Sequence, residues 1–144
     1  MRFRKMIPSD ENAVLDMMRP FYSSPAVYTN GSEAIFRRDF EVCVSESPFL
    51  EGFILEDERG ILGYAMLAHS FSTEFGKPCV WIEDIYLKPE ARGKGLAPEF
   101  LSFVRRIYPD AILRLEVESE NTRATGAYRK SGFSYLPYRE MINQ

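Results

Sequence analysis

The residues of this chain best suited to hold an anion lie in one short basic loop. Arg92, Gly93, Lys94 and Gly95 follow an apolar run and precede a segment with helical spacing. Glycine lets a phosphate approach the backbone because no Cβ intervenes, and a helix start offers unpaired N–H groups and the positive end of the helix dipole. The pattern favours a phosphate site, although a basic surface turn accounts for the same residues. It is neither a P-loop nor a GxGxxG fingerprint.

Two adjacent carboxylates, Glu83 and Asp84, lie in the apolar run before this loop. The run, residues 81–87, is rich in aromatic and β-branched residues and predicts a strand. Neighbours on a regular strand face opposite sides, so only one of the two would face a given cleft unless a bulge re-aims them. Burial and the second negative charge would raise the pKa of either carboxyl toward that of a useful general base. Alternatively, both are solvated or paired with Arg114 or Lys88.

Hydrophobic periodicity predicts elements that position these residues in the order β-α-α-β-β-β-α-β-α-β-β. The predicted strands are residues 2–6, 50–56, 61–68, 81–87 and 111–117, with two short ones within 133–142. The predicted helices follow caps at Ser9 or Asp10, at Ser32, at the glycine loop and at Asn121, and they end near residues 20, 47, 107 and 132. A polar loop is predicted at residues 70–78. Hairpins imply antiparallel neighbours and single crossover helices imply parallel ones, so we expect a mixed sheet.

The composition limits the class of protein. The 144 residues are 45% hydrophobic and 14% aromatic, which suits one domain, 1–144, with its own core. A net charge of −3 argues against a nucleic-acid binder and is compatible with cationic substrates. Residues 1–8 hold charges without an apolar signal core, no apolar run is long enough to span a membrane, and Cys43 and Cys79 lack metal-ligand spacing. We therefore expect a cytoplasmic protein without a metal, nucleic-acid or membrane partner.

Two motifs, in this order, resemble a known family. Residues 92–97 read R-x-x-G-x-A, and residues 121–133 read N-x-x-A-x-x-A-Y-x-x-x-G-F, with a strand-like segment between them. Both patterns are similar to those of the GNAT superfamily of N-acetyltransferases. The resemblance covers residues 50–141 clearly and the first third of the chain loosely. The pattern of residues 82–95, I-E-D-I-Y-L-x-P-E-x-R-G-x-G, is most similar to that of the diamine and polyamine acetyltransferase branch.

The resemblance implies a fold and an activity. The fold is the single-domain acyl-CoA N-acyltransferase fold of the α/β (α+β) class. Its mixed, mostly antiparallel sheet has six to seven strands flanked by four helices, and the parallel central strands splay apart around the acyl-CoA arm. The implied activity is direct transfer of an acetyl group from acetyl-CoA to a primary amine of a small molecule, in a ternary complex.

The resemblance also implies roles for individual residues. Tyr128 occupies the position of the general acid, and a phenol with a pKa of about 10 can protonate a departing thiolate. Glu83 would be the base, acting through water, with Asp84 in a supporting or substrate-binding role. The alternative for Tyr128 is an aromatic that packs its helix on the sheet.

The binding residues follow in the same way. Those that would contact the cofactor are Ile85, Tyr86, Leu87, Arg92, Gly93, Lys94, Gly95, Leu96, Ala97, Asn121 and Tyr128. Those that would line the acceptor pocket are Tyr22, Tyr28, Glu74, Trp81 and Glu83, which suit a cationic amine, although the aromatics could equally be core or dimer surface.

Two other functions fit the same motifs. The fold could hold acyl-CoA as a sensor or regulatory module without turnover, or it could acetylate a protein or peptide amine. The resemblance also implies a homodimer formed through sheet edges or the C-terminal strands.

Overall fold

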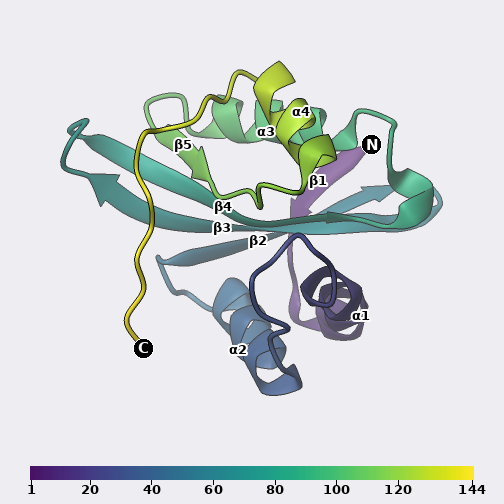
Figure 1. Ribbon diagram of the computed structural model, residues 1–144. Helices are drawn as coiled ribbons and strands as arrows, with labels where there is room; N and C mark the ends of the chain where they lie inside the picture. The colour runs from purple at the N-terminus through teal and green to yellow at the C-terminus, as the bar shows by residue number, and fades with distance from the viewer.

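The computed structural model describes residues 1–144. One five-stranded sheet forms the centre of the protein (Figure 1). Its strands, in spatial order, are β1 (Arg2–Lys5), β2 (Leu50–Asp57), β3 (Gly60–Ser72), β4 (Lys77–Leu87) and β5 (Ile112–Leu115). The first four strands pair antiparallel, and only β4 and β5 are parallel. The expected mixed, mostly antiparallel sheet is therefore confirmed.

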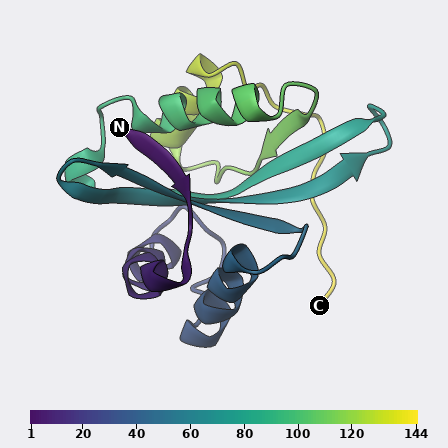
Figure 2. The ribbon, with the colours of Figure 1, turned by 180° about the vertical axis from the view of Figure 1, so that it is seen from behind.

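Helices cover both faces of the sheet (Figures 1 and 2). On one face lie α1 (Glu11–Tyr22) and α2 (Glu33–Val44), and on the other lie α3 (Leu96–Ile107) and α4 (Thr122–Lys130). Two short 3-10 turns, η1 (Pro8–Asp10) and η2 (Pro89–Ala91), precede α1 and α3. None of the helices has the length and apolar composition that crossing a membrane requires.

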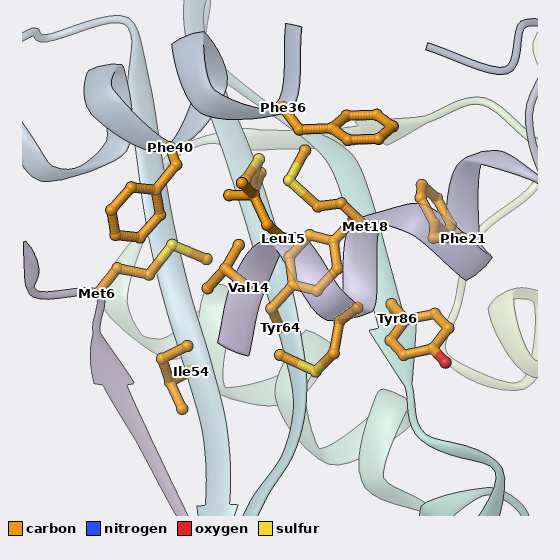
Figure 3. Packing of buried hydrophobic residues seen from close by; sticks show 12 residues of the cluster. Met6, Val14, Leu15, Met18, Phe21, Phe36, Phe40, Ile54, Tyr64 and Tyr86 are labelled. Atoms are coloured by element: carbon orange, nitrogen blue, oxygen red, sulfur yellow. The ribbon is translucent and has the colours of Figure 1, made fainter. Parts of the chain in front are cut away.

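Each face of the sheet has its own hydrophobic core. Figure 3 shows the core under α1 and α2, where Tyr64 of β3 and Tyr86 of β4 pack with Leu15, Met18 and Phe21 of α1. The second core joins the opposite side chains of the sheet to one stripe of α3, formed by Phe100, Leu101 and Val104. This stripe has the spacing that predicted the helix. The site residues on β4 therefore sit between two packed layers.

Local capping chemistry fixes the starts of α2 and α4 as predicted, whereas Asp10, at the start of α1, makes no side-chain cap hydrogen bond. The Ser32 hydroxyl accepts a hydrogen bond from the Ile35 N–H at 3.2 Å, and the Asn121 side chain accepts one from the Ala124 N–H at 3.3 Å. Gly132, with φ +89°, ends α4, and the Phe133 N–H returns to the Tyr128 carbonyl at 3.0 Å. The end of α1 differs, because the helix continues through Pro20 to Tyr22.

The predicted polar loop at residues 70–78 is mostly wrong. The β3 and β4 strands keep pairing as far as Ser72 opposite Lys77, so only residues 73–76 form the turn. The hairpin extends beyond the rest of the sheet (Figure 1). Both of its faces meet solvent at this end, so polar side chains are compatible with a strand.

The two strands predicted within residues 133–142 are absent, so the sheet has five strands where six to seven were expected. The C-terminal segment instead runs in an extended path past β5 (Figure 1). Side chains hold it, since the Tyr138 hydroxyl hydrogen-bonds Glu74 at 3.0 Å and the Arg129 guanidinium lies 5.2 Å from the Tyr135 ring centre. Pro137 interrupts any pairing because it has no N–H to donate.

Candidate active site

The parallel strands β4 and β5 separate midway along their length. Their pairing runs from Cys79 opposite Ile112 to Ile82 opposite Leu115 and then stops, while β4 continues to Leu87 paired with β3 alone. The edge of β4 beyond Ile82 therefore presents backbone groups without a strand partner, which a ligand can hydrogen-bond.

A cleft of about 960 Å³ opens at this separation. This volume lies within the ordinary range for small-molecule sites. Its walls come from β4, the segment after β5, α4, the end of α1 with the following loop, and the C-terminal segment. The lining residues include Tyr22, Tyr28, Trp81, Glu83, Asp84, Ile85, Glu116, Asn121, Tyr128 and Glu140.

A β-bulge at Glu83 determines how the two adjacent carboxylates point. Met66 pairs with Asp84 and Leu67 with Ile82, so Glu83 is an extra residue without a partner on β3. The Asp84 side chain therefore points toward α1 and is 3% exposed, whereas Glu83 is exposed to solvent. Both carboxylates nevertheless line the cleft.

Two tyrosines hold the buried carboxylate of Asp84. The Tyr64 hydroxyl donates to it at 2.8 Å, and the Tyr22 hydroxyl donates at 3.0 Å. Burial raises the pKa of Asp84 to about 6, although both hydrogen bonds act in the opposite direction. Asp84 is thus a fixed group in the wall of the cleft.

Besides Asp84, the carboxylates of Glu83, Glu116 and Glu140 line the cleft. Although one side of Glu83 meets solvent, partial burial of its carboxylate raises its pKa, and the negative charges of Glu140 and Asp39 raise it further. Loss of solvent contact, followed by the contact with Glu140, raises the pKa of Glu116 to about 7. The site therefore favours positive charge in any molecule that enters from this side.

Tyr128 lies on the α4 side of the same cleft. Its ring packs edge-on against Phe133 at 6.1 Å between ring centres, and burial raises the pKa of its hydroxyl. The phenol therefore keeps its proton at neutral pH and can donate it. Asn121 begins the same helix, so one residue caps α4 and lines the cleft.

The glycine loop has the backbone conformation that an anion site needs. Gly93 and Gly95 have φ values of +74° and +80°, a region that favours glycine, and Gly95 directly precedes α3. The Leu96 and Ala97 N–H groups lie in the first helical turn, where no intrahelical acceptor exists, and Pro98 has no N–H. These features fit the diphosphate of a nucleotide-like cofactor.

Comparison with known proteins assigns the family. Residues 12–133 match the acetyltransferase (GNAT) family. This chain is a GNAT family member. It is 36% identical over 106 residues to the thialysine N-epsilon-acetyltransferase of Bos taurus, an alignment that covers 66% of this chain and 62% of that protein. This GNAT chain thus spans about 62% of the length of that curated relative.

Solved structures share the GNAT fold. A possible acetyltransferase from Clostridium difficile 630 superposes with a TM-score of 0.83 at 14% identity, covering 99% of this chain and 96% of that one. An aminoglycoside N-acetyltransferase in complex with CoA superposes with a TM-score of 0.76 at 17% identity, covering 99% and 98%. The predicted family and fold are therefore confirmed.

The structure brings eight of the predicted site residues of this GNAT chain together in one cleft: Tyr22, Tyr28, Trp81, Glu83, Asp84, Ile85, Asn121 and Tyr128. Leu87 and the predicted residues 92–97 lie outside this lining. Arg114, considered above as an ion-pair partner of the two carboxylates, instead lies 4.5 Å from the Trp81 ring centre.

Glu74 and the Tyr86 side chain also lie outside the cleft. Glu74 lies in the turn between β3 and β4, hydrogen-bonded to Tyr138 and outside the lining of the cleft. Tyr86 points into the core under α1 and α2, so only its backbone faces the unpaired edge of β4.

Sequence reasoning missed Tyr64, Glu116 and Glu140. The contact of Tyr64 with Asp84 depends on the bulge, which changes the strand register. Glu116 directly follows β5, and the carboxyl ends of parallel strands meet at one edge of a sheet, so its position could have been inferred. No local sequence pattern distinguishes Glu140, which lies in the C-terminal segment where that segment lines the cleft.

Proposed function

We propose that this protein transfers the acetyl group of acetyl-CoA directly to a primary amine of a small cationic molecule. The observation that supports this proposal best is that Glu83, Asp84 and Tyr128 line one cleft where β4 and β5 separate. A carboxylate and a protonated phenol on two walls of one cleft are the base and the acid that acetyl transfer needs.

The cofactor would lie between the glycine loop and Tyr128. The backbone amides at the start of α3 would hold the diphosphate, as helix N-termini commonly do. The unpaired edge of β4 at Ile85–Leu87 would hydrogen-bond the pantetheine amides. This path directs the thioester toward Tyr128 and the acceptor toward the carboxylates. The CoA complex of the aminoglycoside N-acetyltransferase, which shares the fold, supports the choice of cofactor.

Of the two catalytic residues, Glu83 would act on the attacking amine and Tyr128 on the departing thiolate. An alkylammonium has a pKa of about 10.4, so it must lose a proton before it can attack. Glu83 would accept that proton through water, and the amine nitrogen would then form a bond to the thioester carbonyl carbon. As the carbon–sulfur bond breaks, Tyr128 would give its proton to the thiolate. The second proton of the attacking nitrogen would leave through water, which restores the proton of the phenol.

The acidic lining supports a cationic acceptor. The carboxylates of Glu83, Glu116 and Glu140 surround the mouth of the cleft, and the aromatic rings of Tyr28 and Trp81 line it. Carboxylates and aromatic faces both attract an ammonium group. The likeness to a thialysine N-epsilon-acetyltransferase points in the same direction.

Thiol release from acetyl-CoA tests the proposal. The panel of acceptors contains thialysine, lysine, linear diamines and polyamines, an aminoglycoside and a peptide with a free N-terminus. We expect turnover with at least one small cationic amine and acetylation of that amine by mass spectrometry. Tight CoA binding without turnover on any acceptor would favour the non-catalytic module, and turnover on the peptide alone would favour a protein or peptide acetyltransferase.

A further inference from the structure

A second cavity, of about 670 Å³, runs along β5 next to the cleft. This strand is the last of the sheet, so one of its edges has no strand partner. Every residue from 112 to 117 lines the cavity. Since successive side chains of a strand point to opposite faces, a cavity that meets all of them lies over the free edge. Residues of α3, α4 and the C-terminal segment, which passes β5 in Figure 1, supply most of the other walls.

The two cavities favour opposite charges. The lining of the cleft holds five carboxylates and neither lysine nor arginine. The lining of the second cavity holds four arginines, and its only two acids, Glu116 and Glu140, are shared with the cleft. None of the four makes an ion pair with a carboxylate of the protein; they are Arg105, Arg106, Arg114 and Arg129. The second cavity therefore attracts an anion, whereas the cleft attracts a cation.

Three of these arginines are held in place by uncharged partners. Arg105 donates a 2.6 Å hydrogen bond to the carbonyl of the residue that precedes β5. The guanidinium of Arg114 lies 4.5 Å from the Trp81 ring centre, and that of Arg129 lies 5.2 Å from the Tyr135 ring centre. A contact with a ring face leaves the N–H donors in the guanidinium plane free. The arginines are thus oriented at the cavity while their charge is not neutralised.

Aromatic side chains supply much of the remaining lining. Six rings from the β3–β4 hairpin, α4 and the C-terminal segment border the cavity: Phe75, Trp81, Tyr128, Phe133, Tyr135 and Tyr138. Ring faces and edges of this kind pack against another aromatic ring. The volume lies within the ordinary range for small-molecule sites. The cavity therefore suits a ligand with an aromatic body and a negatively charged group.

We propose that the second cavity binds a small aromatic carboxylate, at a site separate from that of the amine. The carboxylate would accept paired N–H donors from a guanidinium, and it could also accept from the unpaired N–H groups of β5. The aromatic body would pack among the rings of the lining. Trp81 and Tyr128 line both cavities, so the bound carboxylate would lie beside the cleft. The site does not depend on acetyl transfer, because neither CoA nor an amine takes part in it.

Two probes with one ring system test the charge preference. Binding of 2-naphthoate and of its neutral analogue 2-naphthamide is measured by calorimetry. We expect 2-naphthoate to bind and 2-naphthamide to bind about tenfold or more weakly, as for lost hydrogen bonds to a charged group. Trp81 is the only tryptophan, so its indole N–H gives a single resonance in a ¹⁵N-labelled protein, and 2-naphthoate should shift it. No binding of 2-naphthoate, equal binding of the two probes, or an unshifted Trp81 resonance would overturn the proposal.

Substitutions in the lining place the probe. Arg114→Gln and Arg129→Gln should each raise the Kd for 2-naphthoate, and the double variant should raise it about tenfold or more. Ser102→Trp adds a large ring from α3 without a change of charge, so it should abolish binding by filling the cavity. Arg59→Gln, the same charge change at an exposed arginine between β2 and β3, should have no effect. Glu83→Gln should also have none, because Glu83 lines the cleft alone.

The outcomes separate this site from the cleft and from the fold. Unchanged binding in the double arginine variant, or full binding by Ser102→Trp, would overturn the proposal. A loss in Glu83→Gln would also overturn it, because the probe would then lie in the acidic cleft. Thermal unfolding shows whether each variant is folded, and Ser102→Trp decides the matter if the arginine variants are not. A protein that binds 2-naphthoate as expected and acetylates no amine would keep this site and lose the proposed function.

Discussion

Tyr64 donates a 2.8 Å hydrogen bond to the carboxylate of Asp84 from the neighbouring strand, and both side chains are almost fully buried. The bond exists because the bulge at Glu83 turns Asp84 toward the α1 face, where Tyr22 completes the carboxylate's partners. One acid of the adjacent pair is thereby fixed inside the protein, and the other is left at the solvent side of the cleft. The division of roles between them leads to the first predictions.

Asp84 should make the stability of the protein depend on pH. Its pKa is raised by burial from 3.8 to about 6, so the folded state binds more protons than the unfolded state between these values. The stabilisation that Asp84 contributes to the folded state is therefore complete below the pKa of the unfolded chain, and it is lost as the pH rises through about 6. The loss is about 3 kcal/mol, at about 1.4 kcal/mol for each pKa unit. Urea unfolding of wild type and Asp84→Asn at pH values from 4 to about 8 measures it.

The comparison with Asp84→Asn isolates this group from all others that titrate. The free energy of unfolding of the variant minus that of wild type should increase with pH across this window, whatever its value at the lowest pH. Tyr64→Phe provides a second check, because loss of its hydrogen bond should raise the pKa of Asp84 and shift the window upward. A difference independent of pH would contradict the assignment of a raised pKa.

Tyr128→Phe should lower kcat at least tenfold, the usual minimum for a lost general acid, with little change in KM for acetyl-CoA. The phenol lines the cleft and keeps its proton because burial raises its pKa. An aryl thioester is the matched control, since its thiolate leaves without a proton. The variant should recover most of the wild-type rate with that donor. Equal losses with both donors would assign Tyr128 to packing.

Glu83→Gln should lower kcat/KM about a hundredfold and remove the acidic limb of its pH profile. The pKa of Glu83 is raised by its surroundings, so in the wild-type enzyme the rate should fall as the pH drops through a value above that of an ordinary glutamate. Glu116→Gln is the matched control in the same cleft. If the pH profile has an acidic limb near pH 7 that Glu116→Gln removes and Glu83→Gln does not, the base is Glu116, because its pKa is about 7.

The sequence predicted the parts of this fold that depend on local chemistry. Ser32, Asn121 and Gly132 mark helix ends because their side chains or backbone conformations satisfy nearby backbone groups. The glycine loop was visible for the same reason. The bulge at Glu83 was not, because it depends on the register between two strands. The hydrogen bond from Tyr22 to Asp84 joins residues 62 positions apart, beyond the reach of a local pattern.

The C-terminal segment shows another limit of such predictions. Alternating apolar residues after Phe133 suggested strands, but a strand also requires a partner with free backbone groups in register. Side-chain contacts through Tyr135 and Tyr138 hold this segment instead. The same path brings Glu140 to the cleft, which explains why part of the acidic lining was missed.

The two glycines near the proposed cofactor path should respond to alanine in opposite ways. A Cβ at Gly126 would meet nothing within 4 Å and lie inside α4, where alanine is favoured over glycine by about 1 kcal/mol. We therefore expect Gly126→Ala to raise the free energy of unfolding by up to about 1 kcal/mol. Its KM for acetyl-CoA should stay unchanged.

Gly95 also has open space around its Cβ position, but its φ is +80°. An alanine there is strained by about 1 to 2 kcal/mol, so Gly95→Ala should lower stability by that amount. It should also raise KM for acetyl-CoA, because the strain shifts the amides that open α3 and the new methyl group stands beside them. Urea unfolding and steady-state kinetics of both variants measure the contrast. A stable Gly95→Ala enzyme with unchanged KM would show that the anion is held elsewhere, and a raised KM in Gly126→Ala would place the cofactor against the Gly126 side of α4.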